Sequence, residues 1–232
     1  MTDRNAPRPI PLALTALIAL FSALVALALS GGHNAAAHGL ADHHAEHARD
    51  GVSAKELALR QDMRKLWEDH ITWTRLAVIS LTTDSPDTQA TVGRLLQNQA
   101  DIGNAFRPFY GKAAANGLTA LLREHILIAA DLIAAARTGD QNAVAAQQAR
   151  WQANADEIAA FLSKANPRSW KLAETRAMMR AHLRLTTDEV VARLQQDWAA
   201  DVRAYDRIHL QILHMADMLS DGLVAQFPNR FA

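Results

Sequence analysis

The sequence predicts an all-α protein, an up-and-down bundle of about six helices arranged as three antiparallel hairpins. From residue 53 onward apolar residues recur at intervals of three and four, which is the helical period, and no alternating strand-like run occurs. Short segments rich in Asp, Gly and Pro interrupt this pattern. A histidine recurs at an equivalent place in each predicted hairpin. A helical-repeat array is the alternative architecture.

The longer interruptions divide the helical region into three units of two helices each. RPFYGKAAANG (107–117) and SKANPRSW (163–170) contain the Pro and Gly residues expected of connections between units. The resulting hairpin units cover about 53–110, 111–167 and 168–232.

Each unit also contains a shorter break that predicts a tight turn between its two helices. TTDSPDTQ (82–89) and RTGDQNAV (137–144) combine Pro or Gly with Asp residues that can cap a helix. In the third unit Asp197, within LQQDWAADV, is expected to cap a new helix.

The composition excludes several classes of protein. The chain has 24 basic and 24 acidic residues, and this neutral balance argues against nucleic-acid binding, which requires a basic surface. It has no cysteine, so disulfides and thiolate metal sites are excluded.

The first 37 residues resemble a signal peptide. Arg4 and Arg8 precede the apolar stretch 11–30, and the small residues at 35–37 predict cleavage after Ala37. An uncleaved membrane anchor is the alternative, because about 20 apolar residues can span a bilayer. Both interpretations place the protein outside the cytoplasm, in the periplasm or another extracytoplasmic compartment.

Residues 38–52 form a histidine-rich segment, which we expect to be flexible. Imidazole is a common ligand of zinc and copper, so this segment is a candidate metal-binding tail. The alternative is a solvated tether. The four histidines concerned are His38, His43, His44 and His47.

A weak internal repeat carries the main functional signal. LWEDHITW (66–73), LLREHILI (121–128) and MMRAHLRL (178–185) align as two apolar residues, two mostly polar residues and then a histidine. These histidines, His70, His125 and His182, are 55 and 57 residues apart. An amide residue follows each of them after 29 positions: Gln99, Asn154 and Gln211.

This spacing predicts a polar layer across the bundle. Each histidine lies about 14 residues before its turn and each amide about 14 after it, so the two return to the same height. Further candidate ligand-binding or supporting residues are the nearby carboxylates Asp101, Asp131, Asp156 and Asp188.

The layer has three interpretations. A buried imidazole paired with an amide can simply fix the register of the helices. Three histidines at one height can alternatively bind zinc or copper with an open fourth position. The same polar groups could also line a cavity for a small molecule.

Other chemical motifs give little support for catalysis. There is no HExxH, no GxSxG elbow, no phosphate-binding glycine loop and no dinucleotide fingerprint, so no catalytic residue is assigned. His209, His214, Met215 and Met218 form a second candidate group, either for copper(I) or as core filling.

Five segments resemble a family of exported bacterial all-helical proteins, some of which carry glycosyltransferase names. The similarity extends over nearly all of residues 55–231 and implies the helical fold and export, but no activity. The chain lacks the sheet pattern and nucleotide loop that a sugar-nucleotide enzyme would need. The segments are LWEDHITWTR (66–75), LLQNQADIGNAFRPFYG (95–111), LLREHILIAADLI (121–133), ARWQANADEIAAFLSKANP (149–167) and QFPNRF (226–231).

The leading hypothesis is an exported, non-catalytic helical bundle that binds a metal ion, zinc or copper, or a small ligand. The layer and the tail would provide the binding groups. A purely structural or protein-interaction module is the first alternative, and a metal-dependent enzyme is the second. The sequence does not identify a protein partner.

Overall fold

The structure, a computed structural model, describes residues 51–232, and the regular structure there is entirely helical. The all-α prediction is therefore confirmed. The predicted signal peptide at 1–37 and the tail histidines His38, His43, His44 and His47 lie outside the described residues. The elements are α2 (Ala54–Thr83), α3 (Thr88–Thr138), α4 (Gln141–Ala165), α5 (Leu172–Gln195), α6 (Trp198–Gln226) and the short 3-10 helix η1 (Pro228–Arg230).

Side-chain caps begin three of the helices. Ser53 Oγ, Asp140 Oδ1 and Asp197 Oδ1 each accept a hydrogen bond from the backbone N–H three residues later, at 3.2, 2.9 and 2.9 Å. These bonds satisfy N–H groups that have no partner in the first helical turn. The predicted cap at Asp197 is confirmed. At the end of α3, Gly139 adopts the left-handed conformation (φ 75°) that glycine permits without strain.

The predicted connection at 107–117 is much shorter than its eleven residues, because the residues on both sides of one break are helical. A single residue departs from helical geometry, Gly111, whose φ of 81° and ψ of 173° suit glycine alone. Residues 51–232 thus contain five labelled α-helices, of which α3 is divided into two helical parts at Gly111. The two parts of α3 fold back on each other, since a Cβ atom on Gly103 would lie 2.8 Å from the Ala115 carbonyl oxygen.

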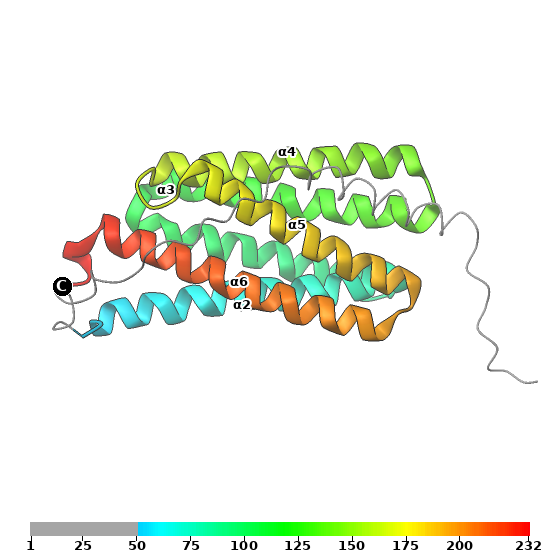
Figure 1. The fold of residues 1–232 in the computed structure, drawn as a ribbon, viewed down its shortest axis with the longest axis horizontal. Coiled ribbons are helices and arrows are strands. Elements are labelled where there is room, and N and C mark those ends of the chain that lie inside the picture. The colour runs from blue at the N-terminus through cyan, green and yellow to red at the C-terminus, as the bar shows by residue number, and fades with distance from the viewer. Residues whose placement is uncertain (1–50) are drawn as a thin grey trace, which may run out of the picture.

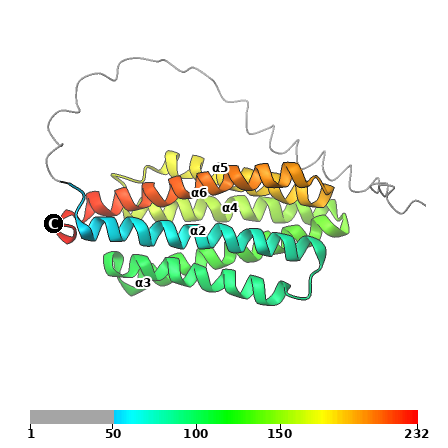
Figure 2. The same ribbon diagram turned by 90° about the horizontal axis from the view of Figure 1, so that it is seen from below.

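The helices form an elongated bundle (Figures 1 and 2). α2 packs against α3 and α6, and α4 packs against α3 and α5, while α5 also packs against α6. The short connections 84–87, 139–140 and 196–197 lie at one end, and the segment 166–171 and the C-terminus lie at the other. None of the helices between residues 51 and 232 combines the length and hydropathy needed to cross a bilayer.

Aromatic side chains close the end of the bundle that carries the C-terminus. The ring of Phe109 lies 5.3 Å from that of Phe227 and 6.1 Å from that of Phe231. Trp170 is fully buried beside Gly222, where a Cβ atom would lie 2.1 Å from the indole nitrogen. This packing holds the segment after α4 and the C-terminal residues against the helices.

Candidate functional site

The three repeated histidines come from three helix segments that run in the same direction. His70 lies on α2, His125 on the second part of α3 and His182 on α5, and their exposed fractions are only 3, 3 and 4%. Helical side chains lean toward the N-terminus of their helix. The rings therefore lean toward the end of the bundle at which these three helix segments begin.

The structure brings these histidines together. The ring centres of His70 and His182 are 5.9 Å apart, and those of His125 and His182 are 6.2 Å apart. All three rings line one enclosed cavity of about 20 Å³. The other residues around this cavity are apolar or aromatic: Trp67, Phe106, Leu118, Leu122, Ile158, Leu162, Met179 and Met215. We call the three imidazoles and their amide partners the histidine layer.

Each imidazole is held through Nδ1 by the amide 29 residues later in the chain. His70 Nδ1 lies 3.1 Å from Gln99 Nε2, while His125 Nδ1 lies 2.8 Å from Asn154 Oδ1. His182 Nδ1 lies 3.2 Å from Gln211 Oε1. The residues that the sequence paired by spacing are therefore hydrogen-bonded to each other.

Backbone carbonyls fix the orientation of two of these amides. Asn154 Nδ2 donates to the Leu121 carbonyl at 3.1 Å, and Gln211 Nε2 donates to the Met178 carbonyl at 3.4 Å. The amide oxygens must then face the imidazoles, so His125 and His182 donate through Nδ1–H and carry a lone pair on Nε2. His125 Nε2 is buried and has no hydrogen-bond partner among residues 51–232.

Between α2 and the first part of α3, two amides, Asn98 and Gln99, share the roles that a single amide has elsewhere in the layer. Gln99 Nε2 donates to the Leu95 carbonyl at 2.9 Å, which turns its NH2 group toward His70. His70 Nδ1 therefore accepts, and its hydrogen lies on Nε2. Asn98 donates instead to the Leu66 carbonyl at 3.0 Å. Sequence reasoning missed Asn98, although the adjacent amides in LLQNQAD were a visible signal.

Burial keeps the three imidazoles neutral. Loss of solvation lowers the pKa of His125 to about 3 and that of His182 to about 4. It also lowers the pKa of His70 well below its usual range, and the neighbouring His182 and His125 add to this effect. Neutral imidazole is the form that binds metal ions.

The four candidate carboxylates do not join the histidine layer. The geometry therefore does not support the prediction that they bind a ligand or support the layer. Asp101 and Asp156 follow the layer amides Gln99 and Asn154 by two residues, which is about 200° around a helix. Asp156 pairs instead with Arg180.

The remaining two carboxylates are turned away in the same manner. Asp131 and Asp188 follow His125 and His182 by six residues, or about 240° around the helix. Asp131 is exposed, and Asp188 pairs with Arg207 at 3.4 Å.

The methionine and histidine group predicted on α6 also does not assemble. His209 Nε2 bonds to Glu68 at 3.0 Å, and His214 is exposed. Met215 points the other way, into the histidine cavity. Adjacent residues on a helix differ by about 100° in direction, which explains the separation.

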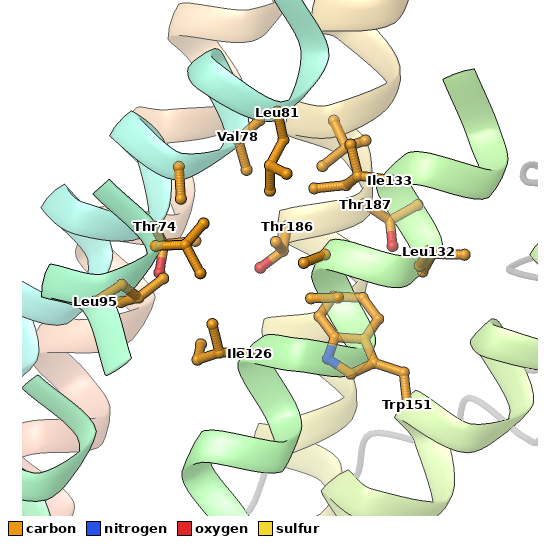
Figure 3. A pocket seen from close by; sticks show the side chains of 15 residues that line it. Thr74, Val78, Leu81, Leu95, Ile126, Leu132, Ile133, Trp151, Thr186 and Thr187 are labelled. Atoms are coloured by element: carbon orange, nitrogen blue, oxygen red, sulfur yellow. The ribbon is translucent and has the colours of Figure 1, made fainter. Parts of the chain in front are cut away.

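A second cavity of about 40 Å³ begins one helical turn from the layer (Figure 3). Thr74 and Thr186, which border it, donate their hydroxyls to the carbonyls of His70 and His182 at 2.8 and 3.0 Å. The rest of its lining is almost entirely apolar. Sites for organic ligands usually measure about 300–1,000 Å³, so neither cavity can hold such a ligand in this closed form.

The imidazoles of the histidine layer are ligands of the type found in metal centres, but their rings lie slightly farther apart than they would around a bound ion. Within residues 51–232 no three His, Asp or Glu side chains already stand as a metal-binding group. An ion bound tetrahedrally by two imidazole Nε2 atoms places the two ring centres about 5 Å apart. The ring centres of His125 and His182, which carry the Nε2 lone pairs, are 6.2 Å apart, so these two rings would have to move about 1 Å closer to share an ion.

A buried ion cluster was not found by sequence reasoning. Arg75 on α2 donates to Glu189 on α5 at 2.8 Å and to Asp201 on α6 at 2.9 Å, and Arg193 donates to Asp201 at 3.2 Å. Glu189 is fully buried, and loss of solvation raises its pKa to about 7. A visible signal was its position seven residues after His182, on the same helical face. We call these four side chains the ion cluster.

No family model, curated protein or solved structure matches the chain. The resemblance to exported all-helical proteins therefore stays a prediction.

Proposed function

We propose that this protein is an exported, non-catalytic bundle of three helical hairpins that binds one transition-metal ion, zinc or copper, in the histidine layer. The observation that carries the proposal is His125 Nε2. This nitrogen carries a buried lone pair that has no hydrogen-bond partner in the described part of the chain, and it belongs to a residue on a cavity that His70 and His182 also line. Buried polar atoms without partners are rare and costly, and a metal ion would satisfy this one.

The size of the cavity favours an ion over an organic ligand. A space of about 20 Å³ is about enough for one water molecule or one metal ion. The amide oxygens of Asn154 and Gln211 supply the outer hydrogen bonds that commonly orient metal-binding imidazoles. Both features support a single small cation.

The three-hairpin repeat gives the site a further property. Each hairpin contributes one imidazole and the amide that holds it. The two imidazoles with a lone pair on Nε2, His125 and His182, come from different hairpins, so one ion bound to both would join these two hairpins. A ligand that binds only the folded state stabilises it in proportion to RT ln(1 + [L]/Kd). We therefore expect metal to raise the unfolding temperature of the whole bundle.

Metal titration of the full-length protein tests the proposal. The sample is a variant with His38, His43, His44 and His47 changed to Ala, so that the tail does not contribute. We expect calorimetry and elemental analysis after dialysis to show about one zinc or copper ion per chain. His125→Ala should lose this ion, whereas His209→Ala, outside the layer, should retain it. The absence of bound metal in the tail variant would refute the proposal, and binding that needs the tail would assign it to the tail alone.

A purely structural layer is the second candidate. Every imidazole–amide bond in the layer lies within one hairpin, and Asn154 and Gln211 also bond to a carbonyl of the facing helix. Such bonds fix helix register without any ligand. A metal-dependent enzyme is less well supported, because a cavity of this size leaves no room for a substrate beside the ion.

A further inference from the structure

We infer that the ion in the histidine layer is copper(I), held by imidazole nitrogens together with the thioether sulfurs of Met179 and Met215. This inference rests on the metal site proposed above. It names the ion and adds two ligands.

Both methionines line the cavity that the three imidazoles share. Met179 on α5 is 4% exposed and Met215 on α6 is 2% exposed. Met215 follows Gln211 by four residues, so the amide that holds His182 and the sulfur beside it share one face of α6. The same two helices thus bring an anchored imidazole and two thioethers to one small space.

The hydrogen bonds of the layer define the set of neutral donors. His125 and His182 present Nε2 lone pairs, whereas His70 carries its hydrogen on Nε2. With Met179 and Met215, the cavity offers two imidazoles and two thioethers. Four such donors suit a d10 ion without strong geometric preference.

The charge of the surroundings favours a monovalent ion. No Asp or Glu side chain of the described chain lines the cavity. The cost of moving an ion from water into a medium of low dielectric constant rises with the square of its charge. A divalent ion therefore pays about four times the desolvation cost of copper(I), with no carboxylate to compensate it.

The softness of the ligands points to the same ion. Thioether sulfur selects copper(I), whereas zinc binds thiolate, imidazole and carboxylate. The chain has no cysteine, so methionine is its only source of sulfur ligands. Two of its six methionines line this one cavity beside the imidazoles.

The test compares copper(I) with zinc on the full-length variant that lacks the tail histidines. Copper(I) is supplied anaerobically from a chromophoric chelator, and zinc is titrated in parallel. Each metal is also present during refolding, so that burial does not prevent loading. We expect one copper(I) ion per chain, bound about a hundredfold or more tighter than zinc, and a sulfur neighbour in its X-ray absorption spectrum.

Two matched pairs of substitutions locate the sulfur ligands. Met179→Leu with Met215→Leu should weaken copper(I) binding about tenfold or more and leave zinc binding nearly unchanged. Met63→Leu with Met178→Leu changes one buried and one half-buried methionine outside the cavity and should leave both affinities unchanged.

The outcomes separate this inference from the proposed function. Zinc binding as tight as or tighter than copper(I), or copper(I) without a sulfur neighbour, would overturn the inference and leave the metal site standing. Failure of both metals to bind would overturn both. The absorption spectrum uses the unsubstituted methionines, so it decides the question even where the leucine variants fold poorly.

Discussion

The histidine layer and the ion cluster accommodate buried polar groups in opposite ways. Both place polar groups inside an apolar helical bundle. The layer uses neutral imidazoles and amides whose partners lie in the same hairpin, 29 residues apart. The ion cluster uses charges, and Arg75 lies 114 and 126 residues from its partners Glu189 and Asp201.

This difference separates contacts that form within one hairpin from contacts that need the whole bundle. A layer pair forms once its own hairpin forms, whereas the ion cluster needs α2, α5 and α6 in place together. Buried charges also depend more strongly on each other than neutral groups do, because an unpaired buried charge is far more costly than an unpaired amide. Removing one partner should therefore destabilise the ion cluster more than the layer.

Arg75→Met should have the largest effect on stability. It leaves the buried carboxylates of Glu189 and Asp201 with Arg193 as their remaining cation, and we expect a loss of about 3 kcal/mol in the free energy of unfolding. Denaturant titration followed by circular dichroism measures this loss. The matched control is Arg64→Met, which removes an exposed ion pair with Asp217 and should cost less than about 1 kcal/mol. Equal effects of the two substitutions would contradict the ion cluster's role.

Asn154→Leu should have an intermediate effect. It removes the partner of His125 Nδ1 and one bond to the Leu121 carbonyl, at a cost of about 2 kcal/mol. Adding His125→Phe should cost less than the sum of the two single changes, because apolar groups then replace both partners. Additive losses in the same denaturant assay would show that the pair is not coupled.

The pH dependence of stability should have opposite signs in the two regions. His125 and His182 have folded-state pKa values of about 3 and 4, below the unfolded value of 6.5. Only the unfolded chain binds these protons between those values, so stability falls as the pH drops below about 6.5. Glu189 has a folded-state pKa of about 7, above its ordinary 4.5, so its contribution to stability rises as the pH falls through that range.

Glu189→Gln isolates these two contributions. Without the compensating carboxyl, the free energy of unfolding should fall more steeply between pH 7 and 5, by up to about 1.4 kcal/mol per pH unit. Denaturant titrations of both proteins at several pH values measure the two slopes. An unchanged or shallower slope in the variant would show that Glu189 does not take up a proton in the folded state.

Asn98→Leu should have the smallest effect. Asn98 donates to the Leu66 carbonyl, which as a helical acceptor keeps another donor, and its Oδ1 accepts from Gln99 Nε2 at 3.1 Å. Gln99 Nε2 keeps the Leu95 carbonyl as an acceptor, so we expect a loss of about 1 kcal/mol. The loss should be smaller than that of Asn154→Leu, because Asn154 holds both the carbonyl and the imidazole. A loss as large as that of Asn154→Leu would mean that the first hairpin follows the same arrangement as the other two.

Pairing within a hairpin could be predicted because height along a helix is proportional to residue number. The turn before Asp197 and the spacing of 29 residues were sufficient to pair His182 with Gln211. The exchange of roles between Asn98 and Gln99 could not be predicted, because it depends on which amide rotamer reaches the facing carbonyl. The connection expected at 107–117 is shorter than predicted, because one residue, Gly111, makes the whole reversal.

By itself, the sequence determined the helices, the positions of the short turns and the imidazole–amide pairs, all of which follow from local spacing. Only the tertiary structure decided which helix faces meet. It brought Met179 and Met215 to the imidazoles, turned Asp101 and Asp156 away, and assembled the ion cluster around Arg75. The physical reason is that contacts between hairpins depend on the rotation and packing of whole helices, which spacing along one chain segment does not specify.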